Sequence, residues 1–231
     1  MLKFAIVTGV LVLWGMTSPA IAMDKFELQC SKLPGGVEVI VKDTPVQFNY
    51  TVSIKELQKL KSPSTSGYAH PGITIGLTKA TSTFKATYAL PGLTLGERAC
   101  VRPKITIELS NSPQTVYVAK EFRQDSCAFS IIFNHEMRHV RANSLNLEST
   151  ANDLKHQLQQ QLKNKVFYGN PDKYMADLKD AMEQYWKPYV MGNLAKANVL
   201  HSQIDTPEEY ASNNTACGGE IPKVLNGSLR M

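Results

Sequence analysis

The chain has 231 residues, of which 43% are hydrophobic and 19% are charged; this composition is typical of globular proteins and excludes intrinsic disorder. The 25 Lys and Arg residues exceed the 20 Asp and Glu residues by five, and no basic cluster resembles a nucleic-acid-binding stripe. We therefore expect no nucleic-acid partner, and the length suffices for one or two domains.

The first 22 residues have the pattern of a secretory signal peptide. Lys3 gives a short positive start, residues 4–16 are almost wholly apolar, and Ala20-Ile21-Ala22 matches a small-residue cleavage pattern. The apolar run is shorter than the ~20 residues of a membrane span, and an uncleaved N-terminal anchor is the alternative. We expect one exported domain, residues 23–231, in the periplasm or outside the cell, without stable membrane association after cleavage.

Four cysteines remain in this exported part: Cys30, Cys100, Cys127 and Cys217. An even number in an exported protein predicts two disulfides and no free thiol. No two of them form a Cys-x-x-Cys pair, which argues against a thiolate zinc cluster or a redox motif. Of the three pairings, we favour Cys100–Cys127 together with Cys30–Cys217.

Residues 23–125 are predicted to be mainly β-structure. Val, Ile, Thr, Phe and Tyr are frequent in six segments, which Gly, Pro and Ser clusters separate. The expected strands are residues 37–41, 46–54, 73–77, 82–90, 105–109 and 115–119. Residues 54–60 could instead form a short helix.

Residues 126–217 are predicted to be mainly helical, and residues 218–231 to be a tail. Residues 128–166 contain no Gly or Pro and have apolar side chains at helical spacing. Residues 168–171 break this helix, a second helical segment with a kink at Pro188 follows, and a capping box at residues 206–209 opens a short last helix. The expected fold is therefore α+β, an antiparallel β region followed by a long helical hairpin.

One motif in the first long helix carries chemistry: His135, Glu136 and His139. Residues i and i+4 share one helical face, so both imidazoles can bind one cation. Glu136 is displaced around the helix and can act as general base on the attacking water. Two neutral imidazoles favour zinc. The alternative is an exposed helix with two solvated histidines.

The motif resembles the zincin class of metallopeptidases, whose active-site helix carries His-Glu-x-x-His. The resemblance implies that His135 and His139 bind zinc, that Glu136 is the catalytic base, and that the substrate is a protein or peptide. The chain is also similar to poorly characterised exported bacterial zinc proteases, in the order of Cys100, Tyr117, Cys127, His135 and Glu136.

The zincin subclass stays open. Metzincins have Gly and His where this chain has Ala142 and Leu145, so that subclass is excluded. We find neither the downstream pattern of the thermolysin kind nor that of the aspzincins.

A third protein ligand is expected, because catalytic zinc sites usually present three. Glu148 lies about 180° around the helix from His139 and faces away, and His156 lies about 25 Å farther along it. If the helical hairpin turns near residue 169, residues 199–203 return beside the motif, which favours His201 as third ligand. The alternatives are Asp205, Glu209 and, with a register displaced by the Pro188 kink, Glu183.

Two further residues lie outside the motif. Tyr210 could hydrogen-bond a tetrahedral oxyanion, or serve as a partly buried anchor. His70 lies in a loop rich in Gly and Pro and is expected to be solvated. The leading interpretation is an exported zinc metallopeptidase, which could bind an extended peptide at a strand edge. The alternatives are a zinc-dependent hydrolase of cell-wall amides and a non-catalytic, disulfide-bonded binding module.

Overall fold

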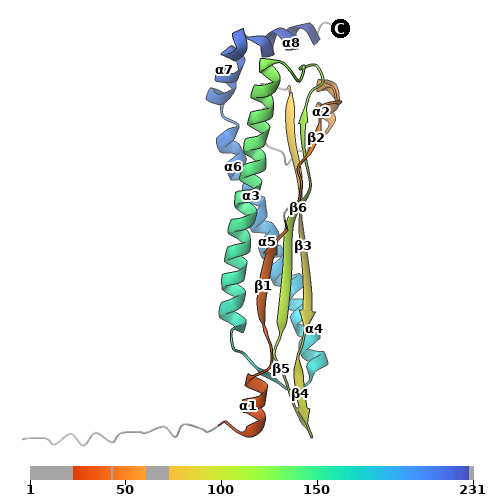
Figure 1. Ribbon diagram of the computed structural model, residues 1–231, viewed down its shortest axis with the longest axis vertical. Coiled ribbons are helices and arrows are strands. Elements are labelled where there is room, and N and C mark those ends of the chain that lie inside the picture. The colour runs from red at the N-terminus through yellow and green to blue at the C-terminus, as the bar shows by residue number, and fades with distance from the viewer. Residues whose placement is uncertain (1–22, 43, 61–72, 229–231) are drawn as a thin grey trace, which may run out of the picture.

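A computed structural model describes residues 23–42, 44–60 and 73–228 of the chain. The expected signal peptide and His70 lie outside these residues. The described residues form an elongated α+β structure, in which a long helix runs beside a long, narrow sheet (Figure 1). No helix among them combines the length and the apolar character that crossing a membrane requires.

The 15-residue strand β6 (Lys104–Val118) is the centre of the main sheet. Strand β3 (Gly76–Ala89) pairs with it antiparallel along one edge. Strands β1 (Gly36–Val41) and β2 (Gln47–Asn49) follow one another along its other edge, both parallel to it. The expectation of a wholly antiparallel region is therefore wrong: side-chain alternation predicts strands but is blind to the direction of pairing.

Two pairs of predicted strands are continuous in the structure. Residues 76–77 of the first prediction and 82–89 of the second lie in β3, and residues 105–109 and 115–118 lie in β6. Three polar residues that separated the second pair in the sequence, Ser110, Asn111 and Gln114, are buried in the sheet. Ser110 hydrogen-bonds Thr83 at 2.6 Å, and Ser82 donates to Asn111 at 2.9 Å. These cross-strand bonds give the buried side chains of Ser110 and Asn111 partners, so the strands need not end there.

A second, antiparallel sheet lies at the end of the molecule where α1 lies (Figure 1). It contains β4 (Gly92–Leu95), β5 (Arg98–Val101) and β7 (Phe167–Tyr168). Helix α1 (Lys25–Ser31) is not among the predicted elements, although Asp24 and Glu27 form a capping box, which is a sequence signal for a helix start. Residues 54–60 form the alternative short helix, α2 (Ile54–Leu60).

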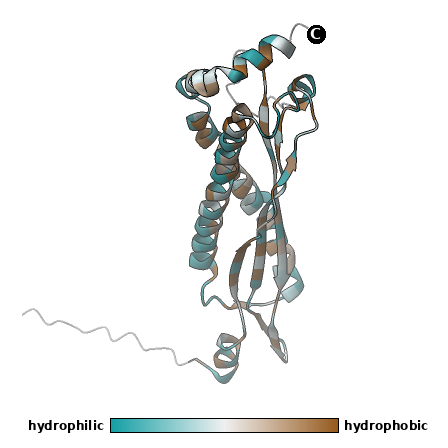
Figure 2. Ribbon diagram, turned by 45° about the horizontal axis from the view of Figure 1, so that its top comes forward, coloured by the Kyte–Doolittle hydropathy of each residue, from teal (hydrophilic) through white to brown (hydrophobic). Residues whose placement is uncertain are grey.

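The predicted long helix is α3 (Cys127–Leu162), and the side chain of Ser126 caps its first turn. Leu147, Ala151, Leu154 and Leu158 of α3 pack in one core cluster with the inward side chains of β6. Figure 2 shows hydrophilic residues predominating on the outward side of α3. Burial of this apolar stripe fixes the rotation of the helix about its axis, and thereby the direction in which His135, Glu136 and His139 point.

The chain returns along α3 in an arm of several short helices rather than in one long helix. A π-helical turn (Met182–Trp186) precedes Pro188, whose missing N–H interrupts the helical ladder. Residues 220–228 of the expected tail form a helix. The return arm contains α4 (Pro171–Ala181), α5 (Lys187–Ala195), α6 (Ala197–Ile204), α7 (Pro207–Thr215), the 3-10 turn Ala216–Gly218 and α8 (Glu220–Ser228).

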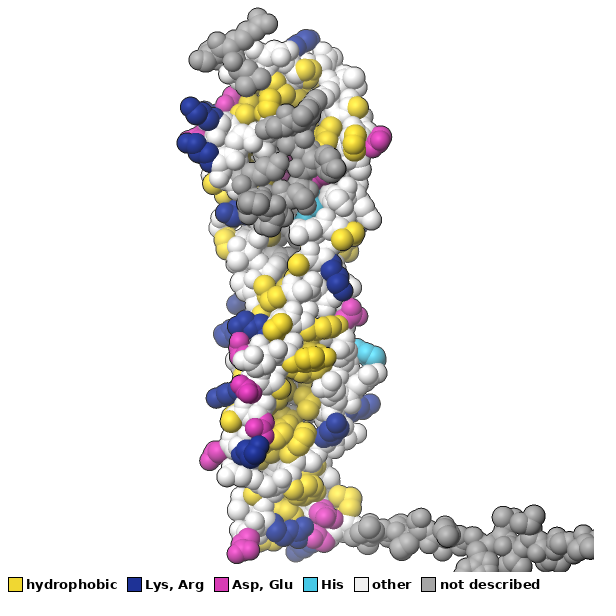
Figure 3. Space-filling view, turned by 180° about the vertical axis from the view of Figure 1, so that it is seen from behind, with side chains coloured by type: hydrophobic (Ala, Val, Ile, Leu, Met, Phe, Trp, Pro, Cys, Tyr) yellow, Lys and Arg dark blue, Asp and Glu magenta, His cyan; other side chains and the backbone are white. Residues whose placement is uncertain are grey.

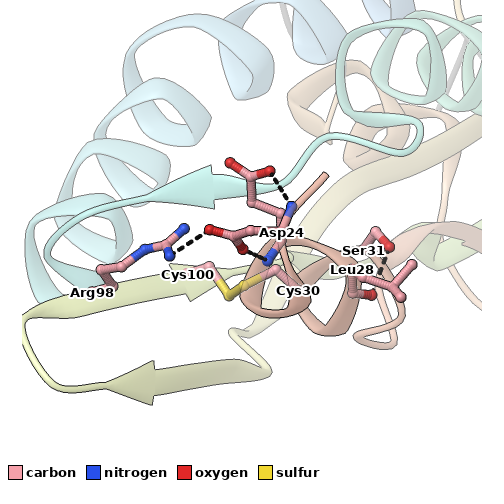
Figure 4. The surroundings of a disulfide bond; sticks show 7 residues. Asp24, Leu28, Cys30, Ser31, Arg98 and Cys100 are labelled. Atoms are coloured by element: carbon pink, nitrogen blue, oxygen red, sulfur yellow. Dashed lines mark hydrogen bonds and ion pairs between the residues drawn. A yellow bond between two sulfur atoms is a disulfide. The ribbon is translucent and has the colours of Figure 1, made fainter. Parts of the chain in front are cut away.

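The structure contains two disulfides and no free cysteine among the described residues, as expected, but the predicted pairing is wrong. Cys30 pairs with Cys100, next to the Asp24–Arg98 ion pair (Figure 4). Cys127 pairs with Cys217. Strand β6 spans about 50 Å between Cys100 and the start of α3, which keeps Cys100 and Cys127 apart. Two disulfides are typical of a protein that folds in an oxidising compartment.

Candidate metal centre

The motif of α3 points into the protein. His135, Glu136 and His139 retain 8%, 5% and 8% of their exposure, so these side chains are not solvated. This burial contradicts the alternative of an exposed helix with two free histidines. Buried polar side chains need partners, and strand β3 and the return arm supply them.

Three ligand atoms converge between α3 and the return arm. Among the described residues, His135, His139 and Asp205 form a buried group that could hold a metal ion. The Nε2 atoms of His135 and His139 are 3.2 Å apart. Oδ1 of Asp205 is 3.0 Å from Nε2 of His135 and 3.1 Å from Nε2 of His139. Ligands bonded at about 2.1 Å around a tetrahedral zinc ion lie about 3.4 Å apart, so the group fits zinc with a small expansion.

The electrostatics of this group favour a cation. Burial opposes ionisation of Asp205, but its close contacts with His135 and His139 and the hydrogen bond from Tyr210 outweigh this effect and hold the pKa of the carboxyl well below its usual range. Burial also opposes protonation of His135, yet its hydrogen bond to Asp205 and the charge of Glu136 raise its pKa. Asp205 is therefore a buried anion between two imidazoles.

Tyr210 supports Asp205. Its hydroxyl donates a 2.7 Å hydrogen bond to the same Oδ1 that faces both histidines. Burial and this hydrogen bond raise the pKa of Tyr210, so the hydroxyl keeps its proton. In this structure Tyr210 is a partly buried donor to the carboxylate.

As the hairpin geometry predicted, His201 lies level with the motif along α3. It lies beside His139, however, and is not part of the group of three ligand atoms. Its Nδ1 is 2.9 Å from Nδ1 of His139, the ring nitrogen on the side away from Asp205. Its Nε2 is 3.0 Å from Oδ1 of Asn143. Burial, with a smaller contribution from nearby His139, lowers the pKa of His201 to about 4.

Glu209 lies on the far side of His135. One of its carboxylate oxygens is 3.6 Å from Nδ1 of His135, and Arg138 binds both groups. The backbone N–H of Glu209 donates to the Thr206 hydroxyl at 3.1 Å, which is the capping bond expected from the sequence.

The remaining acidic and histidine candidates lie elsewhere. Glu183 forms an exposed ion pair with Lys187, and His156 is exposed and hydrogen-bonds Gln160. Glu148 is exposed on α3. None of the three contributes to the group that converges at His135 and His139.

Strand β3 positions the Glu136 side chain. Nothing in the sequence indicated this contact. The Thr78 hydroxyl lies 2.8 Å from Oε2 of Glu136 and 3.0 Å from its backbone carbonyl, and it can donate to either. Burial raises the pKa of Glu136, although the neighbouring histidines and Thr78 counteract part of this effect. No local pattern identifies Thr78, because it lies 58 residues before Glu136.

Gly76 of the same strand leaves space for the Glu136 carboxylate. A Cβ at this position would lie 2.5 Å from Oε1 of Glu136 and 2.7 Å from Ile132. Such contacts are too short for non-bonded atoms, so any larger residue displaces the Glu136 side chain or shifts α3 from β3.

We expect Gly76→Ala to lower any hydrolytic activity by roughly tenfold or more, because a general base contributes ~10²–10⁴-fold and depends on its placement. Zinc affinity should change little, since residue 76 touches none of the three ligand atoms. The control is Gly192→Ala: a Cβ there meets no atom within 4 Å, and Gly to Ala in a helix is neutral or stabilising. Equal activity of the two variants would contradict this role of Gly76.

The metal-ligand group opens onto a cleft of about 640 Å³. Strand β3 and helices α3, α5, α6, α7 and α8 line it, and its charged side chains besides the histidines are Lys79, Glu136 and Asp205. Figure 3 shows that the face seen from behind carries apolar side chains along its length, with charges of both signs among them. The large aliphatic residues of the cleft are Ile73, Ile75, Leu77, Ile131, Ile132, Met191, Leu194, Ile221 and Leu225.

Comparisons with protein-family models, with curated proteins and with solved structures found no match to this chain. The observations define a disulfide-bonded α+β protein with a buried His-His-Asp group that could bind a metal.

Proposed function

We propose that this protein is an exported zinc-dependent hydrolase, and specifically a metallopeptidase. The observation that carries the proposal is the convergence of His135, His139 and Asp205 next to the buried Glu136, in one cleft. Two imidazoles and one carboxylate on zinc, with the fourth position free for water or substrate, are a common catalytic ligand set. Asp205 thus takes the third position, for which the sequence favoured His201.

A bound zinc ion would polarise the substrate carbonyl and make water a stronger nucleophile. Glu136 takes one proton from the water while the water oxygen bonds to the carbonyl carbon. It then passes that proton to the leaving amine as the C–N bond breaks. Its raised pKa suits both steps, because the carboxyl must accept the proton and release it again. The Thr78 hydroxyl orients the Glu136 carboxylate for this transfer.

The cleft supports an extended peptide with apolar side chains as substrate. Among the described residues β3 pairs with β6, and its other edge keeps N–H and C=O groups that can pair with a further strand. Residues 73–82, which include the first half of β3, line the cleft. The mostly apolar lining favours uncharged side chains next to the scissile bond. We propose protein or peptide partners, no nucleic acid, a periplasmic or secreted location, and no stable membrane association of the mature chain.

Metal analysis and zymography test this function together. The purified protein should contain about one zinc per chain, and removal of zinc with a chelator should abolish hydrolysis of a denatured protein substrate. Clearing of a cell-wall gel without clearing of a protein gel would instead support a hydrolase of cell-wall amides. Failure to take up stoichiometric zinc would contradict the proposal and favour a binding module.

A further inference from the structure

A chain of two hydrogen bonds extends from His139 away from the proposed metal position. Nδ1 of His139 is 2.9 Å from Nδ1 of His201, and Nε2 of His201 is 3.0 Å from Oδ1 of Asn143. His139 and Asn143 are four residues apart on α3 and therefore share one face. The two side chains hold the His201 ring between them, from opposite ends of its imidazole.

The polarity of this chain follows from the valence of its atoms. The amide oxygen of Asn143 can only accept, so Nε2 of His201 carries a proton. A neutral imidazole has one N–H, so Nδ1 of His201 is an acceptor, and the proton between the two rings belongs to Nδ1 of His139. Nε2 of His139 is then the ring nitrogen that can give its lone pair to a cation, and it faces Asp205.

We infer that His201 is a positioning residue, which with Asn143 fixes the tautomer and the ring orientation of His139 as a zinc ligand. Metal-binding histidines commonly donate their second ring N–H to an acceptor, usually a carboxylate, carbonyl or water. Here a neutral imidazole is the acceptor. The inference rests on the proposed function in that it assumes a metal at His135, His139 and Asp205.

Zinc affinity of matched variants tests this role. His201→Phe keeps a ring but removes the acceptor, and should weaken zinc binding by at least about tenfold, the usual cost of losing such a partner. Asn143→Leu keeps the approximate volume but removes the acceptor for His201, and should weaken binding in the same direction. Asn143→Asp retains an acceptor and adds charge, so it should bind zinc at least as tightly as the wild type. The control is His156→Phe, which removes an exposed histidine from α3, the helix of His139 and Asn143.

The contrast between the two Asn143 variants separates hydrogen bonding from packing. If Leu and Asp at this position gave the same zinc affinity, or if His201→Phe bound zinc like the wild type, the inference would be wrong. It would also be wrong if His201→Phe lost zinc as completely as His139→Ala and a ring nitrogen of His201 shifted on zinc binding, since His201 would then be a direct ligand.

A long-range ¹H–¹⁵N spectrum of the metal-free protein tests the chain independently of zinc. The inference requires the Nε2–H tautomer of His201 and a proton on Nδ1 of His139; the opposite tautomer of His201 would overturn it. If the wild type bound no zinc, the proposed function would fail, and this spectrum would still decide the hydrogen-bond polarity.

Discussion

Glu136→Gln should abolish hydrolysis while leaving zinc binding near that of the wild type. Gln has the size of Glu and can still accept a hydrogen bond from Thr78, but its amide cannot take a proton from water. General-base catalysis contributes about 10²–10⁴-fold, so we expect kcat to fall by a factor in this range with little change in zinc content. Initial rates on the best substrate from zymography, together with metal analysis, measure both quantities.

Glu148→Gln is the matched control, because Glu148 is an exposed glutamate on the same helix. It should have wild-type activity and zinc content. Retention of activity by Glu136→Gln would exclude Glu136 as the base, and loss of zinc by this variant would make Glu136 part of the ligand set instead.

Asp205→Ala should lose zinc more severely than any variant of a residue that acts through a ligand. Loss of an outer partner costs about 10–100-fold in metal affinity, so loss of a direct ligand should cost more than about 100-fold. Tyr210→Phe removes the hydroxyl that donates to Asp205 and should fall within the range of an outer partner. Zinc competition titrations with a chelator of known affinity would order the two variants.

The control for Asp205 is Asp180→Ala, which removes an exposed carboxylate from the same return arm and should leave zinc affinity unchanged. Thermal melts of the metal-free proteins show whether each variant folds, so that weak binding is not mistaken for unfolding. If Asp205→Ala bound zinc normally and His201→Ala did not, the third ligand would be His201, as the hairpin register had suggested.

The sequence predicted the arrangement of side chains that depends on local spacing. His135, Glu136 and His139 lie within five consecutive residues, and a helix without Gly or Pro fixes their relative directions. The number of disulfides followed from an even count of cysteines, and the α+β class from strand-like segments before a long helix.

Which residue joins His135 and His139 in the candidate metal group depends on the register between α3 and a return arm that begins at Pro171. The reflection about residue 169 located the right region, because helices rise by a constant amount per residue. It could not distinguish His201 from Asp205, since the π-helical turn and the breaks between α5, α6 and α7 change the rise and rotation of the arm. An error of one helical turn exchanges these two residues.

What the sequence determined by itself was therefore the part of the site that one continuous helix holds, because the geometry within a helix is set by its own backbone hydrogen bonds. The tertiary structure alone decided the cysteine pairing, the parallel strands β1 and β2, and the placement of Gly76 and Thr78 against Glu136. These contacts join residues dozens of positions apart. Their distances depend on how far β6 extends and how α3 packs on the sheet, and neither is encoded in a local pattern.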